Sequence, residues 1–97
     1  MIVGVLRLNV YLPENHSLKG KRAVLRKLKA QVSNRFNVSI SECEDQDLWQ
    51  KALLGVSHVG TDEAQVDATL RAVVGFIDGL ALVEVGEEAL EFLHYSD

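Results

Sequence analysis

The strongest constraint on the fold of this chain is a two-residue periodicity near its start, in residues 2–12. One set of alternating positions is apolar apart from one glycine: Ile2, Gly4, Leu6, Leu8, Val10 and Leu12. The positions between them mix apolar and polar side chains: Val3, Val5, Arg7, Asn9 and Tyr11. Because successive side chains of a strand point to opposite faces, the pattern predicts a β-strand with one fully buried face.

A helical periodicity begins after residues 13–15, which break the strand. Ser17 stands at the position of an N-cap, where its hydroxyl can accept a hydrogen bond from a free N–H of the first turn. Apolar residues then recur at helical spacing: Leu18, Leu25, Leu28, Val32 and Phe36. This spacing predicts an amphipathic helix over residues 18 to about 35, ended by Asn37.

Two strands are predicted after this helix. Val38 and Ile40 alternate with serines, which predicts a short strand to about Glu44, and residues 45–47 are typical of a turn. Residues 49–59 are rich in strand formers and predict a longer strand. Its inward side chains are expected to be Ala52, Leu54 and Val56.

A second helix and a last strand complete the prediction. Thr61 is expected to cap the helix, two acidic residues suit its positive end, and Gly79 is expected to stop it. A strand is predicted at residues 80–85. Gly86 is expected to bulge or bend this strand before a further alternation at residues 90–94.

The order strand, helix, strand, strand, helix, strand predicts one α+β domain over residues 1–97. With right-handed crossovers the order corresponds to a ferredoxin-like βαββαβ sandwich, in which a four-stranded antiparallel sheet carries both helices on one face. The other face stays open and is expected to mix apolar and polar side chains: Val3, Val5, Arg7, Asn9, Tyr11, Ser39, Ser41 and Leu53. An oligomer or a partner could cover this face.

Composition limits the class of protein. The 97 residues are 47% hydrophobic and 25% charged, which is typical of a folded domain and not of a disordered chain. Cys43 is the only cysteine, so neither an internal disulfide nor a cysteine zinc site is expected. We recognise no signal peptide and no apolar run of the roughly 20 residues that span a bilayer. A cytoplasmic protein without a membrane partner is therefore expected.

Charge is distributed unevenly along the chain. Residues 1–35 contain eight basic residues and one acid, whereas residues 36–97 contain two basic residues and thirteen acids. The net charge of −4 therefore conceals a first part at +7 and a second part at −11. Such asymmetry is typical of a protein that presents one surface to an anionic partner. The alternative is that the two parts simply attract each other in the fold.

The first helix carries the best candidate for a binding site. At 100° per residue, four cations fall within roughly an 80° arc beside the apolar stripe: Lys19, Arg22, Arg26 and Lys29. Lys21 adds a further cation to the first turn, where Ser17 and His16 are expected to provide additional phosphate contacts. Such a row can follow a nucleic-acid backbone without reading bases, so no sequence readout of DNA is expected. The alternative is a solvated face that only keeps the domain soluble.

Other candidate chemistries are weaker. No aromatic residue lies in the middle of the sheet, so base stacking on the sheet face is not predicted, and Tyr11 and Trp49 are assigned to an interface. The acids at residues 42–47 lack the regular spacing of a cation loop, and the three histidines form no metal motif. No catalytic residue, metal or cofactor is predicted, and we lean against an enzyme.

The chain resembles the bacterial YlxP-like family of unknown function. The resemblance lies in Val3-Gly4-Val5-Leu6, Ser17-Leu18-Lys19-Gly20-Lys21-Arg22, Arg35-Phe36-Asn37-Val38, Gln46-Asp47-Leu48-Trp49-Gln50 and Leu54-Gly55-Val56, and it covers roughly residues 2–60. It implies a ferredoxin-like fold and no established activity. Members of this family are often encoded beside translation and ribosome-maturation factors, which associates the family with RNA or the ribosome.

Three functional hypotheses stay open from the sequence. The first is a non-enzymatic module whose basic helix contacts RNA backbone or a ribosomal particle. The second is a homodimer or protein-partner module that uses the open sheet face and binds no nucleic acid. A binder of a small phosphorylated metabolite at the start of the first helix is a third hypothesis.

Overall fold

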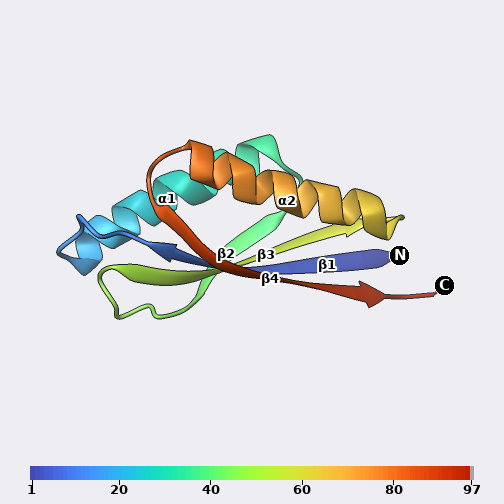
Figure 1. Ribbon diagram of the computed structural model, residues 1–97, viewed down its shortest axis with the longest axis horizontal. Helices are drawn as coiled ribbons and strands as arrows, with labels where there is room; N and C mark the ends of the chain where they lie inside the picture. The colour runs from blue at the N-terminus through green and yellow to red at the C-terminus, as the bar shows by residue number, and fades with distance from the viewer. Residues whose placement is uncertain (97) are drawn as a thin grey trace.

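The computed structural model describes residues 1–96, and Asp97 of the predicted domain lies outside the described residues. The elements follow the order β1 (Ile2–Tyr11), α1 (Leu18–Arg35), β2 (Ser39–Glu44), β3 (Lys51–Gly60), α2 (Glu63–Gly79) and β4 (Glu84–His94). The four strands form one antiparallel sheet in the order β2-β3-β1-β4. Both helices lie on the same side of this sheet (Figure 1). The predicted ferredoxin-like α+β fold is confirmed.

The core lies between the sheet and the two helices. The even-numbered residues of β1 are buried from Gly4 to Val10, as their alternation predicts. The predicted inward residues of β3 are also buried: Ala52, Leu54 and Val56. Four residues of α2 close this layer, namely Val66, Leu70, Val73 and Ile77. Gly4 allows α2 to approach β1 closely, because a side chain here would overlap those of Val66 and Leu70.

The beginning of β4 corrects the sequence prediction. We expected a strand from residue 80, but the strand starts at Glu84. The N–H of Leu80 donates to Phe76 O and the N–H of Ala81 donates to Asp78 O, so the chain is still completing the helical turn at these positions. Ala81 then adopts a φ of 55°, which redirects the chain toward the sheet.

In the second half of the chain, one further expectation is corrected and another is confirmed. The cap of α2 is Asp62 and not Thr61, since the carboxylate of Asp62 accepts from the N–H of Ala64. The predicted irregularity at Gly86 is present, because two residues of β4 lie opposite Asn9 between the pairs Leu8–Glu88 and Val10–Val85.

The face of the sheet opposite the helices is left open by the described residues (Figure 1). Leu53 lies on this face but is only 6% exposed, which the alternation did not predict. It lines a hollow together with Arg7, Asn9, Glu44 and Lys51, so polar side chains surround it. Neither helix in the described part of the chain is long and apolar enough to cross a membrane.

Candidate nucleic-acid interface

All the charged residues of helix α1 are basic. It carries seven basic residues and no acid: Lys19, Lys21, Arg22, Arg26, Lys27, Lys29 and Arg35. Four of these form what we call the basic flank: Lys19, Arg22, Arg26 and Lys29. Lys19, Arg22 and Arg26 are exposed, and Lys29 is half-buried. The structure therefore places these four predicted residues along one side of α1.

The basic flank faces away from α2. On the opposite side of α1, the guanidinium of Arg35 lies 5.2 Å from the ring centre of Phe76 in α2. Val24, on that side too, lines a hollow with Leu82 and Val83 beyond the end of α2. Residues of the basic flank are rotated from these positions by a third of a turn or more, as the 100° step of a helix requires. Their side chains thus project where no second helix covers them.

The charge of the basic flank is not neutralised within residues 1–96. The ion pairs in this range are Arg7–Glu44, Lys21–Glu42, Lys51–Asp45, Arg71–Asp67 and His94–Glu63. None of them involves a residue of the basic flank. Two of the pairs, Arg7–Glu44 and Lys21–Glu42, join the basic first part to the acidic second part, as the alternative interpretation of the charge asymmetry expects. That attraction does not extend to an ion pair with the basic flank.

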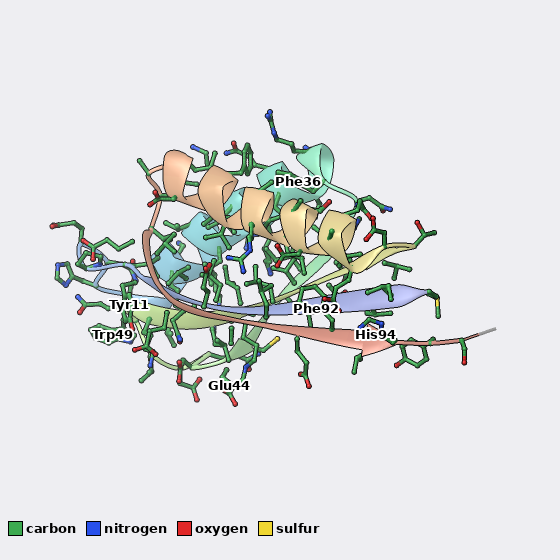
Figure 2. All side chains as sticks on the ribbon, turned by 45° about the vertical axis from the view of Figure 1, so that its right-hand side comes forward. Tyr11, Phe36, Glu44, Trp49, Phe92 and His94 are labelled. Carbon is green, nitrogen blue, oxygen red and sulfur yellow. The ribbon has the colours of Figure 1, made fainter. Side chains whose placement is uncertain are left out.

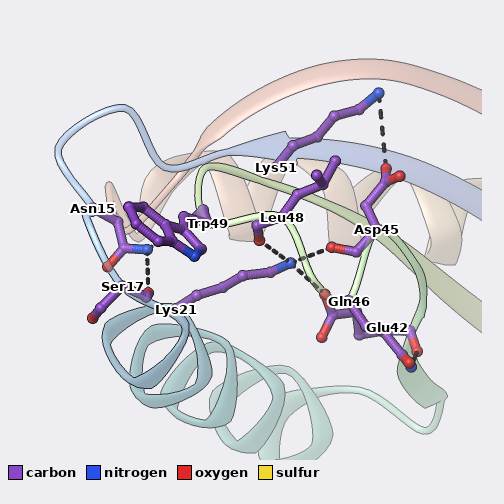
Figure 3. Close-up of polar contacts among 9 residues, drawn as sticks. All are labelled: Asn15, Ser17, Lys21, Glu42, Asp45, Gln46, Leu48, Trp49 and Lys51. Atoms are coloured by element: carbon purple, nitrogen blue, oxygen red, sulfur yellow. Dashed lines mark hydrogen bonds and ion pairs between the residues drawn. The ribbon is translucent and has the colours of Figure 1, made fainter.

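Lys21 corrects the prediction for the first turn. We expected it to present its charge to a phosphate, but it is only 1% exposed. Its ammonium donates to Asp45 O at 2.6 Å and to Leu48 O at 2.7 Å (Figure 3). Glu42 Oε2 lies 2.7 Å from the same nitrogen as an ion-pair partner and has no hydrogen bond within the described residues. Lys21 therefore holds the β2–β3 loop and does not contribute to the exposed surface.

Other polar contacts join the β1–α1 loop to the β2–β3 loop. Asn15 Nδ2 donates to Ser17 O and to Trp49 O, at 2.7 and 2.5 Å (Figure 3). Gln50 Nε2 donates in the other direction, to Pro13 O and Asn15 O, at 3.2 and 2.9 Å. The two loops consequently form one connected platform at the start of α1.

Ser17 and His16 lie at the edge of this platform. Ser17 is the N-cap of α1, as predicted, since its hydroxyl oxygen accepts from the N–H of Gly20 at 2.9 Å. The hydroxyl proton is not engaged by this bond and can still be donated. His16 is exposed and contributes to the wall of a pocket. A ligand at the start of α1 would meet both residues.

The pocket beside His16 also brings together the two predicted interface residues. Tyr11 and Trp49 are 36% and 53% exposed, and they lie at the same end of the molecule (Figure 2). The pocket is shallow, has a volume of about 850 Å³ and is completed by Pro13, Asp47, Leu48, Gln50, Lys51 and Glu84. Sequence reasoning missed it. The available signal was that Tyr11 ends one strand and Trp49 precedes the strand that pairs with it, which brings Tyr11 opposite Lys51.

The remaining polar candidates have structural partners. The ring of His58 is buried: its Nδ1 lies 2.8 Å from Asn37 O and its Nε2 lies 3.0 Å from Gln65 Nε2. Since a carbonyl can only accept, Nδ1 carries the proton and Nε2 accepts from the amide. Cys43 lies on the open face against Gly55. No three His, Cys, Asp or Glu side chains in residues 1–96 are grouped as metal ligands.

Fold and surface together define a small ferredoxin-like α+β protein with one uncovered cationic helix face. Comparison with known proteins supplies the family. Residues 3–89 match the family described as "Protein of unknown function (DUF503)". The chain is also 37% identical over 83 residues to "Uncharacterized protein YlxP" of Bacillus subtilis strain 168, an alignment that covers 86% of this chain and 90% of that relative. The chain belongs to this YlxP-like family of unknown function.

The match extends further than the resemblance of residues 2–60 indicated. It continues through α2 and into β4, as far as Ala89. The acidic second half, as far as Ala89, is therefore part of the family match.

Proposed function

We propose that this protein is a non-enzymatic binding module whose basic flank contacts the phosphate backbone of RNA, free or within a ribosomal particle. The observation that supports this function is the set of exposed cations on α1 without a carboxylate partner in the described residues. Where no neighbouring carboxylate offsets them, such cations produce a positive potential that attracts a polyanion. Arginine in particular matches the geometry of phosphate oxygens.

The geometry suits a backbone and not a base edge. From Lys19 to Lys29 the basic flank advances ten residue steps along the helix, which corresponds to about 15 Å at the usual rise of 1.5 Å per residue. Lys19 and Arg22 begin this row beside His16 and the hydroxyl of Ser17, where the first N–H groups of the helix add positive potential. Contacts of this kind fix position on a nucleic acid and carry no sequence information.

Filter binding of a structured RNA at 50 and 200 mM salt tests the proposal. With about four phosphates neutralised, affinity is expected to fall roughly a hundredfold between the two concentrations. The variant Lys19→Glu/Arg22→Glu/Arg26→Glu should lose binding at both. If the native protein fails to bind at 50 mM, or the triple variant binds equally well, the proposed function is wrong.

A matched control separates the basic flank from net charge. Arg22→Glu and Arg71→Glu change the total charge equally, but Arg71 lies on α2 and pairs with Asp67. We expect only the first to weaken RNA binding substantially. Co-sedimentation with purified ribosomal subunits at low salt then tests whether the RNA belongs to a ribosomal particle.

A second candidate function uses the end of the open sheet face that lies away from Tyr11 and Trp49. Val3 pairs with Val59 and with Leu93 on the neighbouring strands, so three apolar side chains form a row. Val59 and Leu93 are 55% and 40% exposed, and Met1 and Tyr95 extend the exposed apolar area. We propose self-association through this row as the alternative. Sedimentation at tens of micromolar tests it: a monomer that Leu93→Glu leaves unchanged would exclude a stable homodimer.

A further inference from the structure

The pocket beside the start of α1 has walls that suit a flat, uncharged ring. Trp49 and Tyr11 supply exposed aromatic surface, and Pro13 and Leu48 supply apolar surface. Neither aromatic ring is stacked on another in the described residues, where the one aromatic pair is Phe36 with Phe76. Aromatic faces that are solvated and unpaired can stack with a nucleobase, whichever base it is.

Backbone contacts around the pocket position the two residues that carry these rings. A side chain at Gly86 would overlap the ring of Tyr11, so the absence of one lets this ring lie directly against β4 at its bulge. The main chain of Trp49 is held through its carbonyl, which accepts from Asn15 Nδ2. The loop that carries Trp49 is also held by Lys21, through Leu48 O and Asp45 O. The rings are thus presented by a connected platform and not by a free loop.

The pocket rim carries acidic residues, whereas the basic flank carries cations, so the two surfaces suit different parts of a nucleotide. Asp47 and Glu84 at the pocket rim are exposed, and neither has an ion-pair partner in residues 1–96. These carboxylates repel a phosphate but accept hydrogen bonds from the amino groups of bases. The phosphates of the same strand are attracted to Lys19 and Arg22, which lie in the first turns of α1, shortly after the pocket residue His16. Figure 2 places Tyr11 and Trp49 together at one end of the molecule.

We propose that this pocket binds one unpaired base of a single RNA strand whose backbone runs onto the basic flank. The inference rests on the proposed function and adds to it the class of RNA. The preferred ligand is single-stranded next to the site, because a base inside a duplex has no free face to offer Trp49 or Tyr11.

The single tryptophan of the chain makes the pocket directly observable. Emission of Trp49 is recorded while the protein is titrated at 50 mM salt with an octamer of adenylate. A second titration uses an abasic octamer with the same number of phosphates. We expect the adenylate octamer to quench Trp49 and to bind about tenfold more tightly, the effect of stacking roughly one base. The abasic octamer should bind without quenching.

Two tyrosine variants provide a matched pair. Tyr11→Leu removes one wall of the pocket, whereas Tyr95→Leu removes an exposed tyrosine that is hydrogen-bonded to Met1, beside the opposite end of β1. We expect Tyr11→Leu to weaken adenylate binding about tenfold and to leave abasic binding unchanged. Tyr95→Leu should change neither.

The outcomes separate this inference from the function on which it rests. If both octamers bind equally and Trp49 emission does not change, the base pocket is wrong and the basic flank stands. If neither octamer nor structured RNA binds, both proposals are wrong.

Discussion

The two sides of α1 show that the same residue type has different roles within one turn of helix. Lys21 points inward, and its ammonium contacts three oxygens of β2 and the β2–β3 loop. Lys19 and Arg22 are its near neighbours and are exposed without a carboxylate partner in the described range. The difference arises from what lies opposite each side chain, since only the inward side meets the β2–β3 loop.

This difference separates stability from binding. Removal of an ammonium from water is costly unless its charge and its hydrogen-bonding protons are satisfied. For Lys21 they are satisfied by protein groups, so its charge is used inside the fold. The cations of the basic flank form no ion pair within residues 1–96, so little stability depends on those charges. They are available for an anionic ligand.

The largest expected effect tests the inward side. Lys21→Met keeps most of the side-chain volume but leaves Glu42 and two carbonyls without their cation. Loss of one partner of a buried ion pair costs about 3 kcal/mol or more, so the free energy of unfolding should fall by roughly that amount. Urea denaturation followed by the fluorescence of Trp49 measures it, and the same loop carries this reporter.

The control for this prediction is the same substitution on the flank. Lys19→Met should change the free energy of unfolding by no more than about 0.5 kcal/mol, because it removes no partner from a buried group. Equal losses in the two variants would mean that burial does not distinguish the two sides of α1.

Most of the fold could be predicted because its signals are local. The alternation in β1 and the helical stripe of α1 each show which side chains must be buried. Both patterns repeat every two to four residues, so they can be recognised within a short segment of sequence. The start of β4 could not be predicted in the same way. Residues 80–83 are as apolar as a strand, but they are used to finish the turn after α2, and Ala81 adopts a positive φ there.

The site was only partly predictable, for a physical reason that Lys21 illustrates. Its position completes the stripe of Leu25, Leu28 and Val32 at helical spacing, so its inward direction was available from the sequence. Its partners were not, because Asp45 and Leu48 are 24 and 27 residues away. The pocket of Tyr11 and Trp49 likewise depends on the pairing of β1 with β3 and on the path of a loop.

A smaller effect is expected at Ser17, which caps the start of α1. Ser17→Ala removes the oxygen that accepts from Gly20 N–H and should lower the free energy of unfolding by about 1 kcal/mol. Ser17→Asp restores an N-cap acceptor and should keep the stability, but its negative charge beside Lys19 should weaken RNA binding. Thermal unfolding and filter binding of both variants separate the two roles. If Ser17→Ala is as stable as the native protein, the N-cap hydrogen bond does not contribute to stability.

The smallest effect on stability is expected on the basic flank itself. Arg22→Gln and Arg26→Gln each remove one charge that has no carboxylate partner in the described part of the chain. Each should change the free energy of unfolding by less than about 0.5 kcal/mol. Each should also reduce the slope of log affinity for RNA against log salt by about 0.7 to 0.9, which is the contribution of one phosphate contact. Arg71→Gln is the comparison, since Arg71 already pairs with Asp67. A slope that falls equally for Arg71→Gln would mean that RNA responds to total charge and not to this side of α1.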